Sequence, residues 1–304
     1  MNITDTHCDT LCKLTDKNLS FADNNLHISI SKLKPEHQYT QFFACFADEE
    51  FKYDEMGRCR KLIGTFYDKI VSEEQVKFCT NYRELLQGQK ENKMCAFLSV
   101  EGGGGIKSIL DLEYYYKRGV RMVGLVWNND NALASGINGW GGVTELGKEI
   151  IKKMNELSII LDVSHMNDKS FFEAIELTEL PPVASHSCSR AICKNLRNLT
   201  DEQFKVIKEK GGYVGINYYP LFLSGNKNAG VEDIIRHMEH FLDIGGEDII
   251  GIGSDFDGIN ILPEGLNSVG DIDILITAMK RLGWSDCLVE KIMSKNIGNI
   301  IKKI

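Results

Sequence analysis

Six side chains that can bind a metal ion or move a proton stand at the ends of short apolar stretches of this sequence. They are His7, Asp9, Glu101, His165, His186 and Asp255. Alternate residues of a strand share a face, so His7 and Asp9 can point to the same side. One imidazole and one carboxylate on a common face make half of a zinc site. An H-x-D pair is also frequent by chance, and alone it would indicate only a satisfied polar pair on an N-terminal strand.

Glu101 ends the apolar run Leu98-Ser99-Val100 and is followed by four glycines, so its carboxylate can face an open cavity. A carboxylate can bridge two metal ions through its two oxygens, although an exposed glutamate at a strand end is the plainer alternative. Gly102–Gly105 followed by Ile106-Lys107-Ser108 also suggests a phosphate-binding loop. That motif needs glycine immediately before the lysine, where this chain has isoleucine, so a nucleotide hydrolase is disfavoured.

His165 and His186 each terminate an apolar stretch, in Leu161-Asp162-Val163-Ser164-His165 and Val183-Ala184-Ser185-His186. A single histidine at a strand end is more often structural than metal-binding. Two on successive strands, facing the same side as His7, favour a metal site because imidazole is a common ligand. The other four of the seven histidines are expected in loops or on helices, in contact with solvent: His27, His37, His237 and His240.

Asp255 follows Gly251-Ile252-Gly253-Ser254, whose small side chains leave room for a substrate. It is predicted to be a metal ligand or a general base. Asp257, two residues later, is predicted to have a structural role as the cap of the following turn.

Short β-like runs alternate with amphipathic helical patterns along nearly the whole chain. The predicted strands are 2–9, 38–46, 94–101, 119–127, 158–165, 182–187, 213–219 and 248–255. The predicted helices include 144–157 with Thr144 as N-cap, 168–178, 201–210, 231–243, 271–282 and 284–293. This alternation predicts an α/β fold with a parallel sheet.

An open doubly wound sheet and a closed barrel share this local pattern. The candidate site residues, together with Tyr219, fall at the carboxyl ends of different predicted strands. A closed barrel brings those ends together on one face, whereas an open sheet would keep some of them far apart. We therefore expect a (β/α)8 TIM barrel of the metallo-dependent hydrolase type. It is predicted to form a single catalytic domain over 1–304, with an excursion at about 47–92 and closing helices at about 270–304.

Composition excludes several classes of protein. Apolar residues make up 43% and charged residues 26%, as in a globular domain, and the formal charge of −8 argues against a nucleic-acid partner. No apolar run reaches the roughly 18 residues of a membrane span, and the N-terminus is charged where a signal peptide would be apolar. The nine cysteines are odd in number and irregularly spaced, which predicts free and mostly buried thiols. A cytoplasmic protein without a membrane partner is expected.

Taken in order, six motifs, one of them made of the two segments ASHS and RNLTDEQ, resemble the membrane (renal) dipeptidase family of zinc metallopeptidases. They are DTHCD, SVEGG, LDVSH, ASHS with RNLTDEQ, GINYYP and GIGSDFDG, and the likeness runs from about residue 2 to about 300. The resemblance implies a (β/α)8 barrel and two Zn²⁺ per chain. His7 and Asp9 would hold one ion, His165 and His186 the other, and Glu101 would bridge them.

The resemblance also implies hydrolysis of dipeptides by water activated between the metals, with Asp255 as acid and base. Arg197 matches the family's substrate-binding arginine, which would clamp the free carboxylate of the dipeptide. An ordinary surface arginine before the helix N-cap at Thr200 is the alternative. A homodimer is expected from the family alone.

The sequence departs from the family pattern at Trp127, where several members carry a histidine associated with stabilising charge on the reacting carbonyl. Tryptophan has one N–H donor and no acid–base chemistry. Either Asn128 supplies a dipole instead, or this stabilisation rests on the metals alone. Asn128 and Tyr219 are therefore predicted to contact the substrate.

The sequence thus predicts a binuclear zinc dipeptidase, and it leaves open whether its substrates include dipeptides with a C-terminal D-residue. A second hypothesis keeps the metal site but assigns it another amide or a lactone as substrate. A third is a catalytically silent binding protein, against which the complete set of five metal ligands argues.

Overall fold

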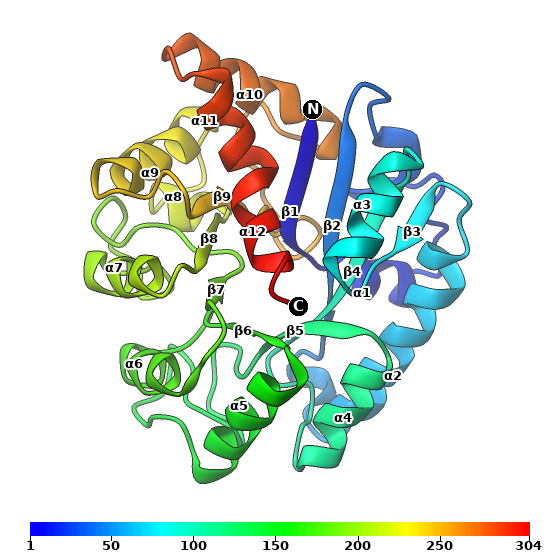
Figure 1. Cartoon of the computed structure of the whole chain (residues 1–304), viewed down its shortest axis with the longest axis vertical. Coiled ribbons are helices and arrows are strands. Elements are labelled where there is room, and N and C mark those ends of the chain that lie inside the picture. Colours follow the sequence, from blue (N-terminus) through cyan, green and yellow to red (C-terminus); the bar gives the residue numbers. More distant parts are fainter.

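Eight parallel strands form a closed ring in the computed structural model, which describes residues 1–304 (Figure 1). Two pairings complete the ring, β1 with β9 and β2 with β4. Its strands are β1 (Asn2–Cys8), β2 (Gln38–Phe46), β4 (Met94–Glu101), β5 (Val120–Gly124), β6 (Ile160–Asp162), β7 (Val183–Ala184), β8 (Tyr213–Ile216) and β9 (Ile250–Ile252). Each lies within a predicted strand, so the (β/α)8 barrel is confirmed and the open sheet is excluded.

Segment 47–92 adds elements outside the ring. They are the 3₁₀ turn η2 (Glu49–Phe51), α2 (Glu55–Thr65), the π-helical turn η3 (Phe66–Val71), β3 (Val76–Phe78) and α3 (Tyr82–Lys90). β3 pairs in parallel with the first residues of β4 and is the ninth strand of the sheet. The sequence pattern did not predict β3, because three residues are too few to show an alternation of polar and apolar positions.

Helices surround the ring of strands (Figure 1). In addition to α2 and α3 they are α1 (Thr10–Asp16), α4 (Ile109–Lys117), α5 (Glu145–Leu157), α6 (Asp168–Leu177), α7 (Asp201–Glu209), α8 (Pro220–Leu223), α9 (Val231–Asp243), α10 (Ile272–Arg281), α11 (Asp286–Glu290) and α12 (Asn296–Ile301). Short 3₁₀ turns occur at η1 (Ile30–Lys32) and η4 (Val269–Asp271), and the π-helical turn η5 (Lys291–Lys295) joins α11 to α12.

Side-chain caps determine where the helices next to the site begin. Thr144 accepts a hydrogen bond from the Gly147 N–H at the start of α5, at the predicted position. Thr200 and Gln203 form a reciprocal capping box at the start of α7. Caps of this kind contribute about 1 kcal/mol each. The two caps end the loops that follow β5 and β7, in which Asn128, His186 and Arg197 lie.

The interior of the barrel is filled at the end where the strands begin. Apolar side chains from six strands form one buried cluster with α12: Phe42, Phe97, Met122, Ile160, Val183, Tyr213, Ile297, Ile300 and Ile301. α12 runs toward the middle of the ring of strands (Figure 1). This end of the barrel is therefore closed by packing, which leaves the opposite end for a site.

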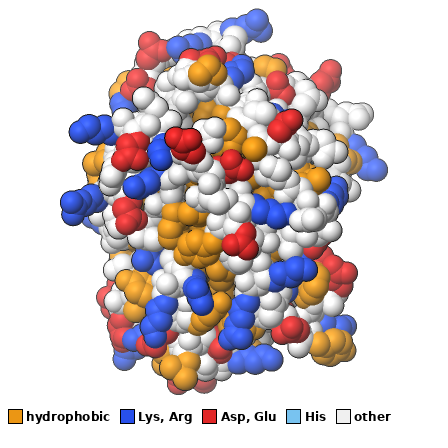
Figure 2. Space-filling model, turned by 90° about the vertical axis from the view of Figure 1, so that its right-hand side faces the viewer, with side chains coloured by type: hydrophobic (Ala, Val, Ile, Leu, Met, Phe, Trp, Pro, Cys, Tyr) orange, Lys and Arg blue, Asp and Glu red, His pale blue; other side chains and the backbone are white.

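Charged side chains of both signs are spread over the outer surface. Figure 2 shows the side of the molecule on which α2, α3 and α4 lie, where exposed apolar side chains sit among Lys, Arg, Asp and Glu. No helix of the structure combines the length and the apolar character needed to cross a membrane. All nine cysteines are free and seven of them are buried, as predicted.

Candidate metal centre

The carboxyl ends of five strands bring six candidate residues together. His7 lies in β1, Asp9 follows it, Glu101 ends β4, and the others lie in the loops just after β6, β7 and β9: His165, His186 and Asp255. The five predicted metal ligands are buried, with exposed fractions between 1% and 7%. Barrel enzymes place their chemistry at this face. The structure therefore assembles in space what the sequence distributes over some 250 residues.

Glu101 divides the cluster into two groups. Its Oε2 lies 3.5 Å from Nε2 of His7, which in turn lies 3.4 Å from Oδ2 of Asp9. Its Oε1 lies 2.9 Å from Nε2 of His165 and 3.5 Å from Nε2 of His186. One carboxylate thus presents an oxygen to each of two sets of ligand atoms, within which all atoms are less than 4.8 Å apart.

The hydrogen bonds behind two histidines fix which ring nitrogen carries the proton. Nδ1 of His165 lies 2.8 Å from Oδ1 of Asn128, an amide oxygen that can only accept. Nδ1 of His186 lies 2.7 Å from Oγ of Ser185, whose own proton goes to Oδ2 of Asp162 at 2.5 Å. Both Nδ1 atoms therefore donate, and both Nε2 atoms present lone pairs.

Those two Nε2 atoms face each other at 3.0 Å, with the Glu101 oxygen beside them. Lone pairs and a carboxylate oxygen converging in a buried space need a cation between them. In the other group, Nε2 of His7 and Oδ1 of Asp9 are buried without a hydrogen-bond partner. Buried polar atoms are rarely left unpaired, and imidazole nitrogen with carboxylate oxygen is the donor set of Zn²⁺. The residues present therefore fit a pair of metal ions that share Glu101.

The protonation of these groups agrees with a site built for positive charge. Burial opposes ionisation of His7, yet Glu101 and Asp9 raise its pKa well above the ordinary value. Burial also opposes ionisation of Glu101, but the three neighbouring histidines hold the pKa of its carboxyl well below the ordinary value. Burial lowers the pKa of His165 to about 4 and that of His186 well below its usual range, so both are neutral.

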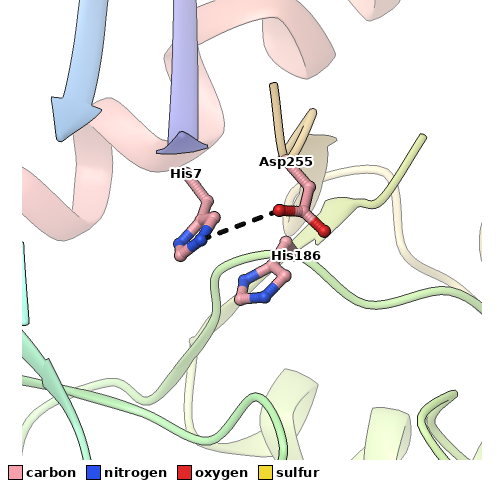
Figure 3. A group of neighbouring side chains, drawn as sticks. All are labelled: His7, His186 and Asp255. Atoms are coloured by element: carbon pink, nitrogen blue, oxygen red, sulfur yellow. Dashed lines mark ion pairs between the residues drawn. The ribbon is translucent and has the colours of Figure 1, made fainter. Parts of the chain in front are cut away.

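Asp255 borders the cluster from the side of β9. Its Oδ1 lies 3.9 Å from Nε2 of His7, and Figure 3 shows both side chains pointing toward the space next to His186. Its Oδ2 accepts a hydrogen bond of 2.9 Å from Nδ2 of Asn217. Burial, together with Asp9 and Glu101, raises the pKa of Asp255 to about 7. The left-handed backbone of Asp255, with φ of 63°, is uncommon outside glycine and directs the carboxylate into the cluster.

A cavity of about 510 Å³ opens above the cluster. Its wall contains Asp9, Glu101, His165, His186 and Asp255, together with the predicted substrate-binding residues Asn128 and Tyr219. Trp127 also lines it, with its ring centroid 5.3 Å from that of Phe46 and 6.0 Å from that of His165. A small polar substrate can therefore reach the ligand atoms from this side.

Arg197 lies behind His186 and does not line the cavity. Its guanidinium donates to Oγ of Ser187 at 2.8 Å and to the carbonyl of His186 at 2.9 Å, and its Nε is buried without a partner. Only 3% of the residue is exposed, so the interpretation as an ordinary surface arginine is wrong. No carboxylate pairs with it within 4.0 Å, which is unusual for a buried charge.

Comparison with known proteins places the chain in a family. The profile of the family described as membrane dipeptidase (peptidase family M19) matches residues 1–304. The chain belongs to the membrane dipeptidase family. It is an enzyme of the metallodipeptidase class, as the sequence predicted.

Sequence relatives match about three quarters of the chain, and solved structures match all of it. An uncharacterized protein in the pqqA 5' region of Klebsiella pneumoniae is 32% identical over 246 residues, which are 77% of this chain and 90% of that protein. A metallopeptidase from Rhodobacter sphaeroides, crystallised with a phosphinate mimic of L-Ala-D-Ala, is 26% identical with a TM-score of 0.91, over 100% of this chain and 99% of that one. The M19 dipeptidase AC is also 26% identical, with a TM-score of 0.93 over 100% and 98%.

Sequence reasoning missed the residues that support the ligands. Asp162 accepts from the backbone N–H groups of Ser164 and Ser185 as well as from the Ser185 hydroxyl. A carboxylate inside an apolar strand is a signal that could have revealed it, because a buried charge needs several partners. Asn217, which holds Asp255, carries no comparable signal in the sequence.

Two predictions about neighbouring residues had different outcomes. Asp257 has the predicted structural kind of contact, but its carboxylate accepts from the His27 N–H and from the Thr10 hydroxyl and does not cap the following turn. The expectation that the remaining histidines contact solvent is wrong for His237, whereas the side chains of His27, His37 and His240 keep exposed fractions of 24%, 9% and 20%. His237 is fully buried between the N–H of Ser189 and the carbonyl of Leu223, and the others are largely covered and bound to aspartate side chains or their backbone: His27, His37 and His240.

The four glycines after Glu101 have a steric role. All have positive φ, between 52° and 78°. A Cβ on Gly103 would lie 2.7 Å from the carbonyl oxygen of Leu125, and one on Gly105 would lie 2.7 Å from the backbone nitrogen of Met56. The glycines therefore let the chain turn away from β4 in close contact with its neighbours, which accounts for the motif without a phosphate ligand.

Proposed function

We propose that this protein hydrolyses dipeptides with two zinc ions. His7 and Asp9 would hold one ion, His165 and His186 the other, and Glu101 both. The observation that carries the proposal is the Glu101 carboxylate, whose two oxygens face two separate sets of ligand atoms below an open cavity. When bound, the metal pair supplies Lewis-acid chemistry that polarises a carbonyl and makes water more acidic.

Asp255 is the proposed acid and base. Asn217 holds its Oδ2, so its Oδ1 is the oxygen left to exchange protons with the substrate side of the cluster. In peptide hydrolysis it would take the proton from the attacking water and pass it to the departing amine. This role requires an oxygen at the position of Oδ1 that can take up and release a proton. It does not require Asp255 to be one of the metal ligands.

Arg197 is the proposed anchor for the C-terminal carboxylate of the dipeptide. The support is its buried guanidinium, which has no carboxylate within ion-pair distance and an Nε without a partner. Its position next to Phe222, with 5.9 Å between the guanidinium carbon and the ring centroid, is close to the part of the wall formed by Phe222 and Tyr219. The C-terminal residue would therefore lie at this side of the cavity.

The substrate range is proposed to include dipeptides with a C-terminal D-residue, with support from the L-Ala-D-Ala mimic bound to the Rhodobacter relative. We also place the reaction in the cytoplasm, since nine free cysteines suit a reducing compartment.

A substrate panel tests the proposal. The zinc-loaded protein is assayed against L,L- and L,D-dipeptides, a tripeptide, and a set of lactones and cyclic amides. The expected result is cleavage of dipeptides, lost on chelation and restored by zinc. Turnover of lactones or cyclic amides without cleavage of dipeptides would assign the same metal site to another substrate. Full metal loading without any turnover would indicate a binding protein.

A further inference from the structure

Asn128 lies between the metal cluster and the substrate cavity, with its amide oxygen Oδ1 on the side of the cluster and its amide nitrogen Nδ2 available to the cavity. It lies in the loop that follows β5, and its backbone carbonyl accepts a hydrogen bond of 2.8 Å from the Asn138 N–H, which anchors the loop. Its Oδ1 lies 2.8 Å from Nδ1 of His165, a residue 37 positions away in the chain. The side chain also forms part of the cavity wall.

The contact with Oδ1 determines how His165 can bind a metal. An amide oxygen accepts and cannot donate, so Nδ1 of His165 carries the proton and Nε2 keeps its lone pair. That lone pair faces Oε1 of Glu101 at 2.9 Å. The backbone of His165 has a φ of 67°, an uncommon value for a non-glycine residue, and such a conformation persists only where the surrounding structure holds it.

His165 and His186 are supported in different ways. His186 has the Ser185 hydroxyl and, through it, the carboxylate of Asp162. His165 has the Asn128 amide as the one hydrogen-bond partner of its Nδ1. Loss of the Asn128 oxygen would therefore leave the His165 ring without a polar partner on the side away from the metal.

The nitrogen of the same amide faces the substrate space. With Oδ1 bound to His165, Nδ2 makes no hydrogen bond within the protein, and it is not among the buried polar atoms that lack a partner. The Asn128 carbonyl accepts from Asn138 and its Oδ1 contacts His165, so the NH2 group is the polar group of the residue that remains for a ligand. It is a free donor on the wall of the 510 Å³ cavity, which the neighbouring Trp127 also lines.

We propose that Asn128 is a positioning residue that orients His165 for metal binding, and that its NH2 group donates a hydrogen bond to an oxygen of the bound substrate. The second part rests on the proposed dipeptidase function for the identity of that substrate. The first part holds for any metal-dependent reaction at this site.

Two variants separate the two parts, with a neighbouring residue as control. Asn128→Asp keeps an oxygen acceptor for His165 and removes the NH2 donor, whereas Asn128→Ala removes both. Asn129→Ala is the matched control, because the Asn129 amide binds Glu49 and Asn138 away from the ligands. Zinc release into a chelator is followed for each protein without substrate, and KM and kcat for a dipeptide are measured at saturating zinc.

Asn128→Ala is expected to release one ion roughly 10–100-fold faster than the wild type, as for other residues that orient metal-bound histidines. Asn128→Asp should release zinc no faster than the wild type. Both variants should raise KM for the dipeptide by about tenfold, from the lost hydrogen bond. The control should match the wild type in both measurements.

Zinc release from Asn128→Ala at the wild-type rate would overturn the positioning role, and so would faster release from Asn128→Asp with an unchanged fold by circular dichroism. A wild-type KM in Asn128→Ala would overturn the donor role. Failure of the dipeptidase proposal looks different, because the wild type would then hold zinc and cleave no dipeptide. The zinc-release comparison would still decide the positioning role.

Discussion

Replacement of Asp255 by asparagine separates catalysis from metal binding and from folding. The backbone at Asp255 has a φ of 63°, a conformation that Asn adopts more readily than most residues. The Asn217 amide, 2.9 Å from Oδ2, can donate equally to an asparagine oxygen. The free energy of unfolding should therefore change by less than about 1 kcal/mol.

The expected loss of activity is much larger. General acid–base catalysis contributes about 10²–10⁴-fold, which is about 3–5 kcal/mol in the activation free energy. Asp255→Asn should lower kcat by that factor while both metal ions stay bound. Asp255→Ala gives a contrast, because alanine at positive φ and an unpartnered Asn217 amide together cost about 2 kcal/mol or more of stability.

The assay combines kcat for a dipeptide at saturating zinc, metal content per chain and a thermal melt. A kcat within tenfold of the wild type would refute the acid–base role. Loss of one ion from Asp255→Asn would show instead that Asp255 is a metal ligand, in the group that it forms with His7 and His186.

Three further predictions follow from the site. His165→Ala should lose one ion per chain and nearly all activity, measured by metal analysis and turnover; retention of both ions would exclude His165 as a ligand. Arg197→Ala should raise KM for dipeptides roughly 10–100-fold, because a charge-assisted hydrogen bond contributes about 1.5–3 kcal/mol, and a change confined to kcat would contradict the anchoring role. Chelation should lower Tm by at least about 5 °C, and added zinc should restore it. Ions that bind only the folded protein stabilise it by about 4 kcal/mol when the free ion is at a thousand times Kd. An unchanged Tm would show that metal binding does not stabilise the fold.

The barrel and the cluster of ligands were predictable from the sequence because they rest on local patterns. Each strand of the ring has a short apolar run, and a parallel barrel places the ends of such runs on one face. Residues like Glu101 and His186 could therefore be selected by their place at a strand end. Their distances confirm the grouping in space, and their roles as ligands stay predictions.

Other features depend on contacts between distant parts of the chain. The hydrogen bonds of Asn128 with His165 and of Asp162 with Ser185 join residues at the ends of different strands. The buried carboxylate of Asp162 can be noticed in the sequence, but its partner cannot, and nothing in the local sequence links Asn128 to His165. Arg197 could be matched to the family by its motif, but its burial behind His186 depends on the path of the loop between β7 and α7. His237 was misjudged because its place on a helix, α9, does not show that the loop after β7 covers it.

Anomalous diffraction at the zinc absorption edge, from crystals of the zinc-loaded protein, tests the central claim most directly. The account predicts two peaks per chain, one in contact with His7, Asp9 and Glu101 and the other with Glu101, His165 and His186. A single peak, or two peaks of which only one contacts Glu101, would contradict the shared metal centre.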